Sequence, residues 1–189
     1  MLATSCLEES LNKMEKQKWL AELAGFIVEA NGKTWAGEGR EVPPERPGYK
    51  ELEYSRGIWK LRDSYTGYFR APGMTTVYFK GMPSWTMSYG GSGQLNGFEN
   101  IAKPTFAFLK HSLMQVTPQM PFRGPKEVIG RNVHEGFTYE FSLVKGDITD
   151  FVGEERIRRD MDKVFEQIVF GGTVRHKNPE RTVIEPWEL

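Results

Sequence analysis

The segment from Glu51 to Tyr89 constrains the fold most, because it contains four stretches with the two-residue periodicity of β-strands. In the last stretch, Trp85, Met87 and Tyr89 fall on one side, and three serine or threonine residues fall on the other. Glycine or proline bounds each stretch, as is typical of turns. We therefore predict four consecutive strands at residues 51–55, 58–65, 75–79 and 84–89.

Tight turns make these strands antiparallel. Arg56-Gly57 is predicted to connect the first two and Lys80-Gly81 the last two, since glycine readily adopts the positive φ of hairpin turns. Gly90-Gly91 is predicted to end the fourth strand, which puts Tyr89 at the margin of the sheet.

The register of the last hairpin depends on its loop length. A two-residue loop places Thr76 opposite Trp85 and Met74 opposite Met87, and we expect this register. A change of one residue brings Val77 and the residues that alternate with it to that face instead.

Two segments show helical periodicity. The first covers about residues 5–29, and its apolar stripe shifts near Lys16–Lys18, so that it forms either one bent helix or two helices. The second runs from about Lys103 to Val116. Its predicted buried stripe consists of Ala102, Phe106, Leu109, Leu113 and Val116.

The rest of the chain completes an α+β domain over residues 1–172. Residues 34–49 are rich in glycine and proline, and we expect an extended loop without regular structure. Further strands are predicted at 137–144, 150–156 and 164–170, whereas 157–163 fits either a strand or a short helical turn. The expected architecture is a curved antiparallel sheet of about six to seven strands, with both helices packed on one face. Residues 173–189 form a C-terminal tail that docks back onto the domain or onto a neighbour.

Composition narrows the functional classes. The chain has 189 residues, and its 25 basic and 25 acidic side chains balance, which argues against nonspecific nucleic-acid binding. Cys6 is the only cysteine, so no internal disulfide forms, and the chain lacks a long apolar run. We expect a soluble, cytoplasmic protein with no membrane partner. The three histidines are scattered and phosphate-binding or nucleophile motifs are missing, so we expect no metal, no cofactor and no known catalytic residue set.

Asp63 is the most informative candidate for a site. By alternation it shares a strand face with Leu61 and Tyr65, which makes that face the inner one. A buried carboxylate needs a partner, and Arg46 or Arg123, both in proline-bracketed loops, fits that role. Two interpretations stay open: a buried salt bridge that clamps a loop onto the sheet, or a binding or catalytic site.

The candidate ligand-binding residues are the charged and aromatic groups that flank this face: Glu41, Arg46, Asp63, Tyr65, Trp85, Tyr89 and Arg123. The aromatic face of residues 84–89 either belongs to a closed core or lines a pocket. If only part of it lines a pocket, Tyr89 is the pocket residue and Trp85 belongs to the core. In the pair Glu154 and Glu155, we expect one carboxylate in solvent and one in a salt bridge, because they point to opposite faces.

The order and spacing of several motifs resemble a prokaryotic family. They include Asp63-Ser-Tyr65, Lys80-Gly-Met-Pro-Ser-Trp85, Pro121-Phe-Arg-Gly124, Gly153-Glu-Glu155 and Phe170-Gly-Gly172. The chain is similar from about residue 24 to 172 to the domain of unknown function 5680. The resemblance implies no established activity. In bacteria this domain often follows an Xre-type helix-turn-helix, which implies a sensor or effector role there. The present N-terminal segment holds only one or two helices, so nucleic acid is not an expected partner.

Three functions follow from these features. The favoured one is a non-enzymatic small-molecule-binding or sensor-type module, because aromatic walls and a few convergent polar groups are typical of ligand pockets. The second is a homo-oligomeric assembly module, a homodimer formed through the tail or an exposed strand edge. The third is an enzyme in which Asp63 or Glu41 acts as a base and Arg46 or Arg123 holds an anion.

Overall fold

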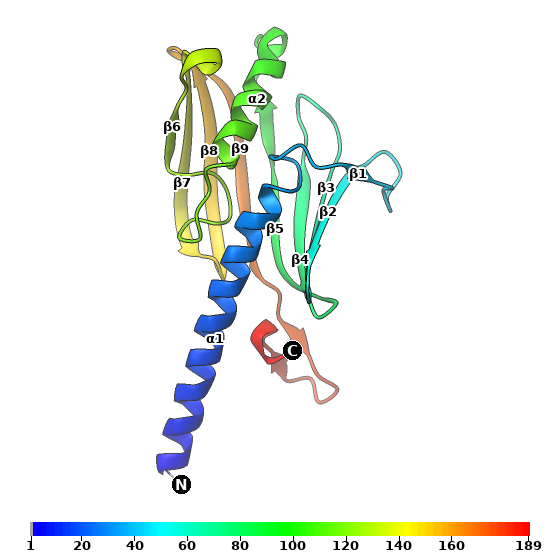
Figure 1. Cartoon of the computed structure of the whole chain (residues 1–189), viewed down its shortest axis with the longest axis vertical. Helices are drawn as coiled ribbons and strands as arrows, with labels where there is room; N and C mark the ends of the chain where they lie inside the picture. Colours follow the sequence, from blue (N-terminus) through cyan, green and yellow to red (C-terminus); the bar gives the residue numbers. More distant parts are fainter. Residues whose placement is uncertain (1) are drawn as a thin grey trace.

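The computed structural model describes the backbone of residues 2–189 and the side chains of residues 10–189, so the side chain of Cys6 lies outside the described part. Nine antiparallel strands form one sheet in the order β1-β2-β3-β4-β5-β9-β8-β7-β6 (Figure 1). The α+β class and antiparallel sheet are confirmed, but the expected six to seven strands were too few. The strands are β1 (Glu41–Val42), β2 (Lys50–Arg56), β3 (Trp59–Tyr65), β4 (Gly73–Phe79), β5 (Met82–Gln94), β6 (Glu127–Ile129), β7 (Phe137–Asp147), β8 (Asp150–Arg159) and β9 (Asp162–Thr173).

The two additional strands are short edge strands. In β1, Glu41 and Val42 pair with Leu52 and Glu51 of β2, which contradicts the prediction that residues 34–49 lack regular structure. The strand stops at Pro43, because proline has no N–H to donate to a partner strand. At the opposite edge, β6 pairs with β7. Strands of two or three residues are too short to produce a recognisable alternation.

The structure differs from two predictions: the position of the first turn and the register of the second hairpin. Arg56 pairs with Trp59, so Gly57-Ile58 forms the first turn in place of Arg56-Gly57. Lys80-Gly81 does connect β4 and β5, but a bulge follows at once and places Val77 opposite Trp85. The expected pairing of Thr76 with Trp85 was therefore wrong, because the bulge inserts one residue into β5 and reverses the faces.

The strand β5 is also longer than predicted. It continues past Gly90 through a second bulge to Gln94, and Gly91 and Gly93 adopt positive φ within the irregular part. Residues 157–163 form the β8–β9 hairpin, in which Arg159 pairs with Asp162, and not a helical turn.

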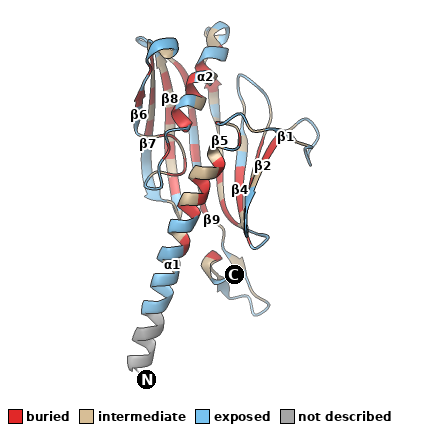
Figure 2. Ribbon diagram, in the orientation of Figure 1, coloured by how far each residue is buried: buried red, intermediate tan, exposed pale blue. Residues whose placement is uncertain are grey.

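Both helices cover the same face of the sheet (Figure 1). The helix α1 (Leu2–Asn31) is continuous, so of the two alternatives for the region near Lys16–Lys18 the one with two helices is wrong. Its N-terminal part extends beyond the sheet (Figure 1), and residues 10–18 are mostly exposed, whereas its C-terminal part buries Trp19, Leu23 and Phe26 (Figure 2). Short 3-10 turns precede α2, at η1 (Glu99–Ile101), and β7, at η2 (Asn132–His134).

The helix α2 (Ala102–Leu113) is shorter than predicted, but four of the five residues of the predicted stripe are buried: Ala102, Leu109, Leu113 and Val116. Phe108 is fully buried and lies 5.4 Å from Phe137 of β7, while Phe106 is only half-buried. The prediction was wrong for Phe106, whereas Val116 is buried although it lies beyond the end of the helix. Thr105, Phe108 and Ser112 widen the buried face, and Phe106 lines a pocket that the next section describes.

The tail folds back onto the domain. It forms a small hairpin, β10 (His176–Lys177) with β11 (Val183–Ile184), and the turn η3 (Pro186–Glu188). Trp187 contacts Trp19 of α1 with ring centroids 6.1 Å apart. Docking on the chain's own domain is thus one of the two outcomes expected for this segment. Within the described residues, no helix combines the length and the apolar character needed to cross a membrane.

Candidate functional site

A pocket of about 390 Å³ lies between the helix-covered face of the sheet, α2 and the loop that follows α1. Strands β3, β4, β5 and β9 form its floor. Asp63 belongs to β3 and is paired there with Thr75 of β4. Aromatic side chains form much of the wall: Trp35, Tyr65, Tyr68, Phe69, Tyr89, Phe106 and Phe165. Polar groups at the floor are few: Asp63, Thr75, Arg123 and Gln167.

Asp63 is buried and accepts hydrogen bonds from neutral groups only. The Thr75 hydroxyl donates to Oδ1 at 2.8 Å, and the Tyr89 hydroxyl lies 3.1 Å from Oδ1 and 3.2 Å from Oδ2. Burial raises the pKa of Asp63, and the hydrogen bonds and the positive charge of Arg123 oppose that rise without cancelling it. Among the described residues, no ion pair includes Asp63, and Arg123 pairs with Glu155, so the structure contradicts the salt-bridge interpretation of Asp63.

The side chain of Tyr89 passes over Gly73 to contact Asp63. Its ring lies over Gly73 of β4, which is paired with both Tyr89 and Tyr65. A Cβ atom on Gly73 would sit 2.4 Å from the Tyr89 hydroxyl oxygen and 2.7 Å from the Cβ of Tyr65. Any side chain at Gly73 would therefore displace the ring from Asp63. Burial, followed by the negative charge of Asp63, raises the pKa of Tyr89 well above its usual value, so the phenol stays a hydrogen-bond donor.

Arg123 belongs to the loop between α2 and β6, and its partner is Glu155 of β8. Its Nε lies 3.0 Å and 3.1 Å from the two carboxylate oxygens of Glu155, which is fully buried. Glu155 also accepts hydrogen bonds from Tyr139, at 2.8 Å, and from Gln167. Burial alone would lower the pKa of Arg123, but Glu155 outweighs it and keeps the guanidinium charged. Glu154 is partly exposed but pairs with Arg156, so the two carboxylates differ in burial as expected, while both, and not one, are in ion pairs.

The Arg123 guanidinium also lies over the face of Tyr89, with Cζ 5.2 Å from the ring centroid. Tyr89 therefore has Arg123 on its ring and Asp63 at its hydroxyl. This arrangement brings together three of the predicted site residues in one cavity, and Tyr65 joins them on its wall.

Three predicted site residues lie elsewhere. Trp85 is completely buried, stacks on Phe151 at 5.9 Å and donates from Nε1 to the Ile148 carbonyl at 2.9 Å. It belongs to the core, whereas Met87 and Tyr89 line the pocket, so the face is divided between the two roles. Glu41 is exposed and pairs with Lys50 at 3.5 Å.

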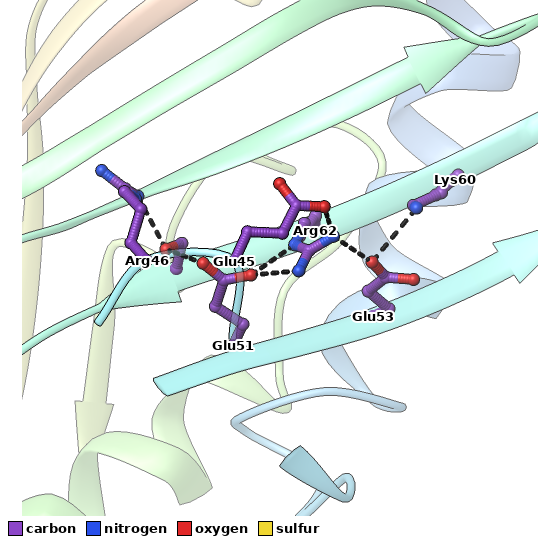
Figure 3. A network of polar contacts seen from close by, with 7 residues as sticks. Glu45, Arg46, Glu51, Glu53, Lys60 and Arg62 are labelled. Carbon is purple, nitrogen blue, oxygen red and sulfur yellow. Dashed lines mark hydrogen bonds and ion pairs between the residues drawn. The ribbon is translucent and has the colours of Figure 1, made fainter. Parts of the chain in front are cut away.

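Arg46 lies on the outer face of the sheet (Figure 3). It donates to the Ser64 hydroxyl at 2.7 Å and stacks on Tyr49, with Cζ 4.0 Å from the ring centroid. Ser64 follows Asp63 in β3 and points to the opposite face, which separates Arg46 from the pocket. The clamp expected at Asp63 occurs here instead, where Ser64 and Arg62 both donate to the buried Glu51.

Several wall residues were not predicted. Trp35 comes from the loop after α1, and the Lys110 ammonium of α2 lies over its ring at 5.1 Å from the centroid. Gln167 sits on the inward side of β9, opposite Glu155. The alternation of β9 could have identified Gln167 as an inward polar residue, but loop residues such as Trp35 carry no local signal.

The histidines are closer together than their sequence positions indicate. The rings of His111 and His134 lie 5.0 Å apart, beside Phe108. In the part of the chain that the structure describes, no three histidine, cysteine or carboxylate side chains gather in a geometry that could hold a metal ion.

Comparison with known proteins gives a family but no activity. Neither the curated proteins nor the solved structures contain a match to this chain. Residues 63–174, more than half of the chain, match the family described as "Domain of unknown function (DUF5680)". The matched region begins at Asp63 and includes Tyr89, Arg123 and Glu155. The chain belongs to the DUF5680 family.

Proposed function

We propose that this protein is a small-molecule-binding module whose ligand occupies the pocket between the sheet and α2. The observation that carries the proposal is a cavity of about 390 Å³ with aromatic walls and a buried carboxylate and guanidinium on its floor. Ligand sites typically combine such apolar walls with a small number of fixed polar groups, in volumes of roughly 300–1,000 Å³.

The polar groups support this function because the fold holds them in place. Asp63 is fixed by Thr75 and Tyr89, and Arg123 is fixed by Glu155. A ligand therefore meets donors and acceptors that are already oriented, which reduces the entropy lost on binding. These residues come from β3, β4, β5, β8 and the α2–β6 loop, so ligand binding would tie together the two halves of the sheet.

Acid–base catalysis is a second candidate, and the raised pKa of Asp63 favours it. Since Glu41 and Arg46 lie outside the pocket, the catalytic pair of this alternative reduces to Asp63 as base and Arg123 as anion holder. Binding needs neither group to exchange a proton, and it is the simpler use of groups that already have hydrogen-bond partners.

A fragment screen by protein-observed NMR tests the proposal. Ala107 lines the pocket from the exposed side of α2, so Ala107→Trp should fill the entrance without disturbing the core. Ala21→Trp, on the exposed side of α1, is the matched control. Fragments that shift Met87 and Gln167 resonances in the wild type and in Ala21→Trp, and lose at least about tenfold in affinity in Ala107→Trp, would support the function. A screen in which no fragment perturbs pocket resonances would refute it.

A further inference from the structure

We infer that the pocket recognises a planar heterocycle with a ring N–H beside a ring carbonyl, that is, a lactam or an imide. The N–H would donate to Asp63 and the carbonyl oxygen would accept from Arg123. This inference rests on the proposed function, because it specifies the ligand class of the same pocket.

The first argument is the unused edge of Arg123. Its hydrogen bonds to Glu155 come from Nε, and no described residue accepts a hydrogen bond from Nη1 or Nη2. The side chain lines the pocket and is still 12% exposed, so these N–H groups can meet a ligand. Because Glu155 already balances the charge, the free edge is suited to a neutral acceptor such as a carbonyl oxygen.

The second argument is the carboxylate of Asp63, which has spare acceptor capacity. An ionised carboxylate can accept about four hydrogen bonds, and only the hydroxyls of Thr75 and Tyr89 donate to it among the described residues. It is buried without a cation in contact, so an N–H donor from a ligand would form a charge-assisted bond there.

Tyr89 contacts both this donor and this acceptor. Its hydroxyl contacts Asp63, and its ring lies under the Arg123 guanidinium. A ligand that covers the Tyr89 side chain therefore meets an acceptor at one end and a donor at the other. Adjacent N–H and C=O groups on one ring present the complementary pattern.

The walls favour a flat ring over a flexible chain. Phe106 of α2 lies 5.2 Å from Tyr68 and 6.2 Å from Phe165, edge to face in both pairs. Together with Trp35 these rings form an aromatic lining on which a planar ligand can stack.

Beside Asp63 and Arg123, charge disfavours a free acid or amine, whereas the exposed Lys50 and Lys103 and the half-buried Lys110 line other parts of the pocket. A carboxylate would approach Asp63, and Glu155 already neutralises Arg123. An ammonium would approach Arg123, whose charge reaches far enough to act on Asp63. A neutral heterocycle avoids both repulsions and still uses both groups.

Five bicyclic probes of similar size test the inference by NMR titration. Isoquinolin-1(2H)-one carries the N–H and the carbonyl, 2-methylisoquinolin-1-one lacks the N–H, and isoquinoline lacks the carbonyl. 1-Naphthoic acid and 1-naphthylmethylamine represent an anion and a cation. We expect the lactam to bind at least about tenfold more tightly than each of the others. A higher affinity for the acid, the amine or the methylated lactam would overturn the inference.

Two variants assign the contacts without removing the fold. Asp63→Asn keeps the size of the side chain but removes the charge, and Arg123→Lys keeps a cation opposite Glu155 but removes the guanidinium edge. Each should reduce the affinity for isoquinolin-1(2H)-one by about tenfold and leave isoquinoline binding within about twofold. Arg46→Lys, on the outer face, is the control and should change neither. An unchanged lactam affinity in both pocket variants would contradict the inference.

The two proposals fail in different ways. If all five probes bind the pocket with equal affinity and all are blocked in Ala107→Trp, the ligand class is wrong and the binding function stands. If none of the five shifts a pocket resonance, the lactam assignment falls, and the fragment screen decides separately whether the pocket binds other compounds.

Discussion

The Tyr89 hydroxyl lies within hydrogen-bond distance of both carboxylate oxygens of Asp63, at 3.1 Å and 3.2 Å, although the two residues belong to strands that do not touch. The strand β4 lies between β3 and β5, and at this point it contributes only Gly73 and Thr75. Gly73 leaves space for the ring, and Thr75 adds a third hydrogen bond to the carboxylate at 2.8 Å. The acid is therefore held by the floor of the pocket itself.

Tyr89→Phe should destabilise the protein and raise the pKa of Asp63 further. The hydroxyl donates to a buried carboxylate, and hydrogen bonds to charged groups contribute about 1.5–3 kcal/mol. The loss should be larger at neutral pH, where more of Asp63 is ionised. Urea unfolding measures the free energy, and the carboxyl carbon resonance of Asp63 measures the pKa. Tyr65→Phe removes a hydroxyl from the same wall but no bond to Asp63; an equal pKa rise in that variant would contradict the prediction.

The stability of the Asp63→Asn variant relative to wild type should increase as pH rises. The folded state raises the pKa of Asp63, so it holds the proton more tightly than the unfolded chain does. The stability due to Asp63 is therefore complete below the unfolded pKa and is lost as pH rises through the folded pKa. Since asparagine does not titrate, the unfolding free energy of Asp63→Asn relative to wild type should increase from about pH 4 upward. Urea unfolding across that range measures it. Asp150→Asn, an exposed site, should show no such trend; a falling relative stability in Asp63→Asn would refute the assignment.

How far these residues could be predicted from sequence depends on the element that carries them. Asp63 was correctly predicted to face inward, because β3 has no bulge and simple alternation holds along it. In β5 alternation still grouped Trp85 with Tyr89, but the register with β4 was wrong, because a bulge follows the turn. The residue pattern around Ser84 contains no signal for that insertion.

The partner of Asp63 was beyond prediction for a different reason. Arg46 and Arg123 both lie in proline-bracketed loops, and local patterns cannot tell which face of the sheet a loop reaches. The structure places Arg46 on the outer face of the sheet and Arg123 on the inner face, where Glu155 forms an ion pair with Arg123. Only the three-dimensional path of the chain shows that Glu155, identified as one of two alternating carboxylates, is the ion-pair partner.

Arg123→Met should be strongly destabilising, by about 3–5 kcal/mol, because it leaves the fully buried Glu155 carboxylate without its cation. The double variant Arg123→Met/Glu155→Gln should recover part of the loss, since the remaining buried groups are neutral. Urea unfolding of both single variants and the double variant gives the coupling energy, which should exceed about 1 kcal/mol. The exposed pair Lys50 and Glu41 serves as control and should couple by less than about 1 kcal/mol. Additive effects at Arg123 and Glu155 would show that the pair is not a unit.

Trp187→Ala should destabilise the fold by about 1–2 kcal/mol, because it removes the tail's aromatic contact with Trp19. The Lys16 ammonium, 4.8 Å from the Trp187 ring centroid, would lose its cation–π partner as well. Urea unfolding measures the loss, and acrylamide quenching of Trp fluorescence should show that Trp19 becomes more accessible. Val183→Ala, at an exposed tail position, is the control and should stay within about 0.5 kcal/mol of wild type. Unchanged stability in Trp187→Ala would mean that the tail does not support α1.

Glu51→Gln should produce the opposite pH dependence to Asp63→Asn, although both acids are buried in neighbouring strands. Burial alone would raise the pKa of Glu51, but hydrogen bonds from Ser64, at 2.9 Å, and from Arg62 outweigh it and lower the pKa (Figure 3). The stability due to a lowered pKa is present above the unfolded pKa and is lost as pH falls through the folded pKa.

The glutamine variant should therefore be less stable than wild type by about 1.5–3 kcal/mol at neutral pH, and the difference should shrink in acid. Urea unfolding between about pH 3 and pH 7 measures both values. Glu45 contacts the same Arg62, but its side chain is 74% exposed, so Glu45→Gln should stay within about 1 kcal/mol at every pH. A difference between Glu51→Gln and wild type that grows as pH falls would reverse the sign and contradict the role of Arg62 and Ser64. In the structure, Glu51 is held by an ion pair on the outer face of the sheet, and Asp63 is held by neutral hydrogen-bond donors on the inner face. That result would mean that the two faces do not differ in this way.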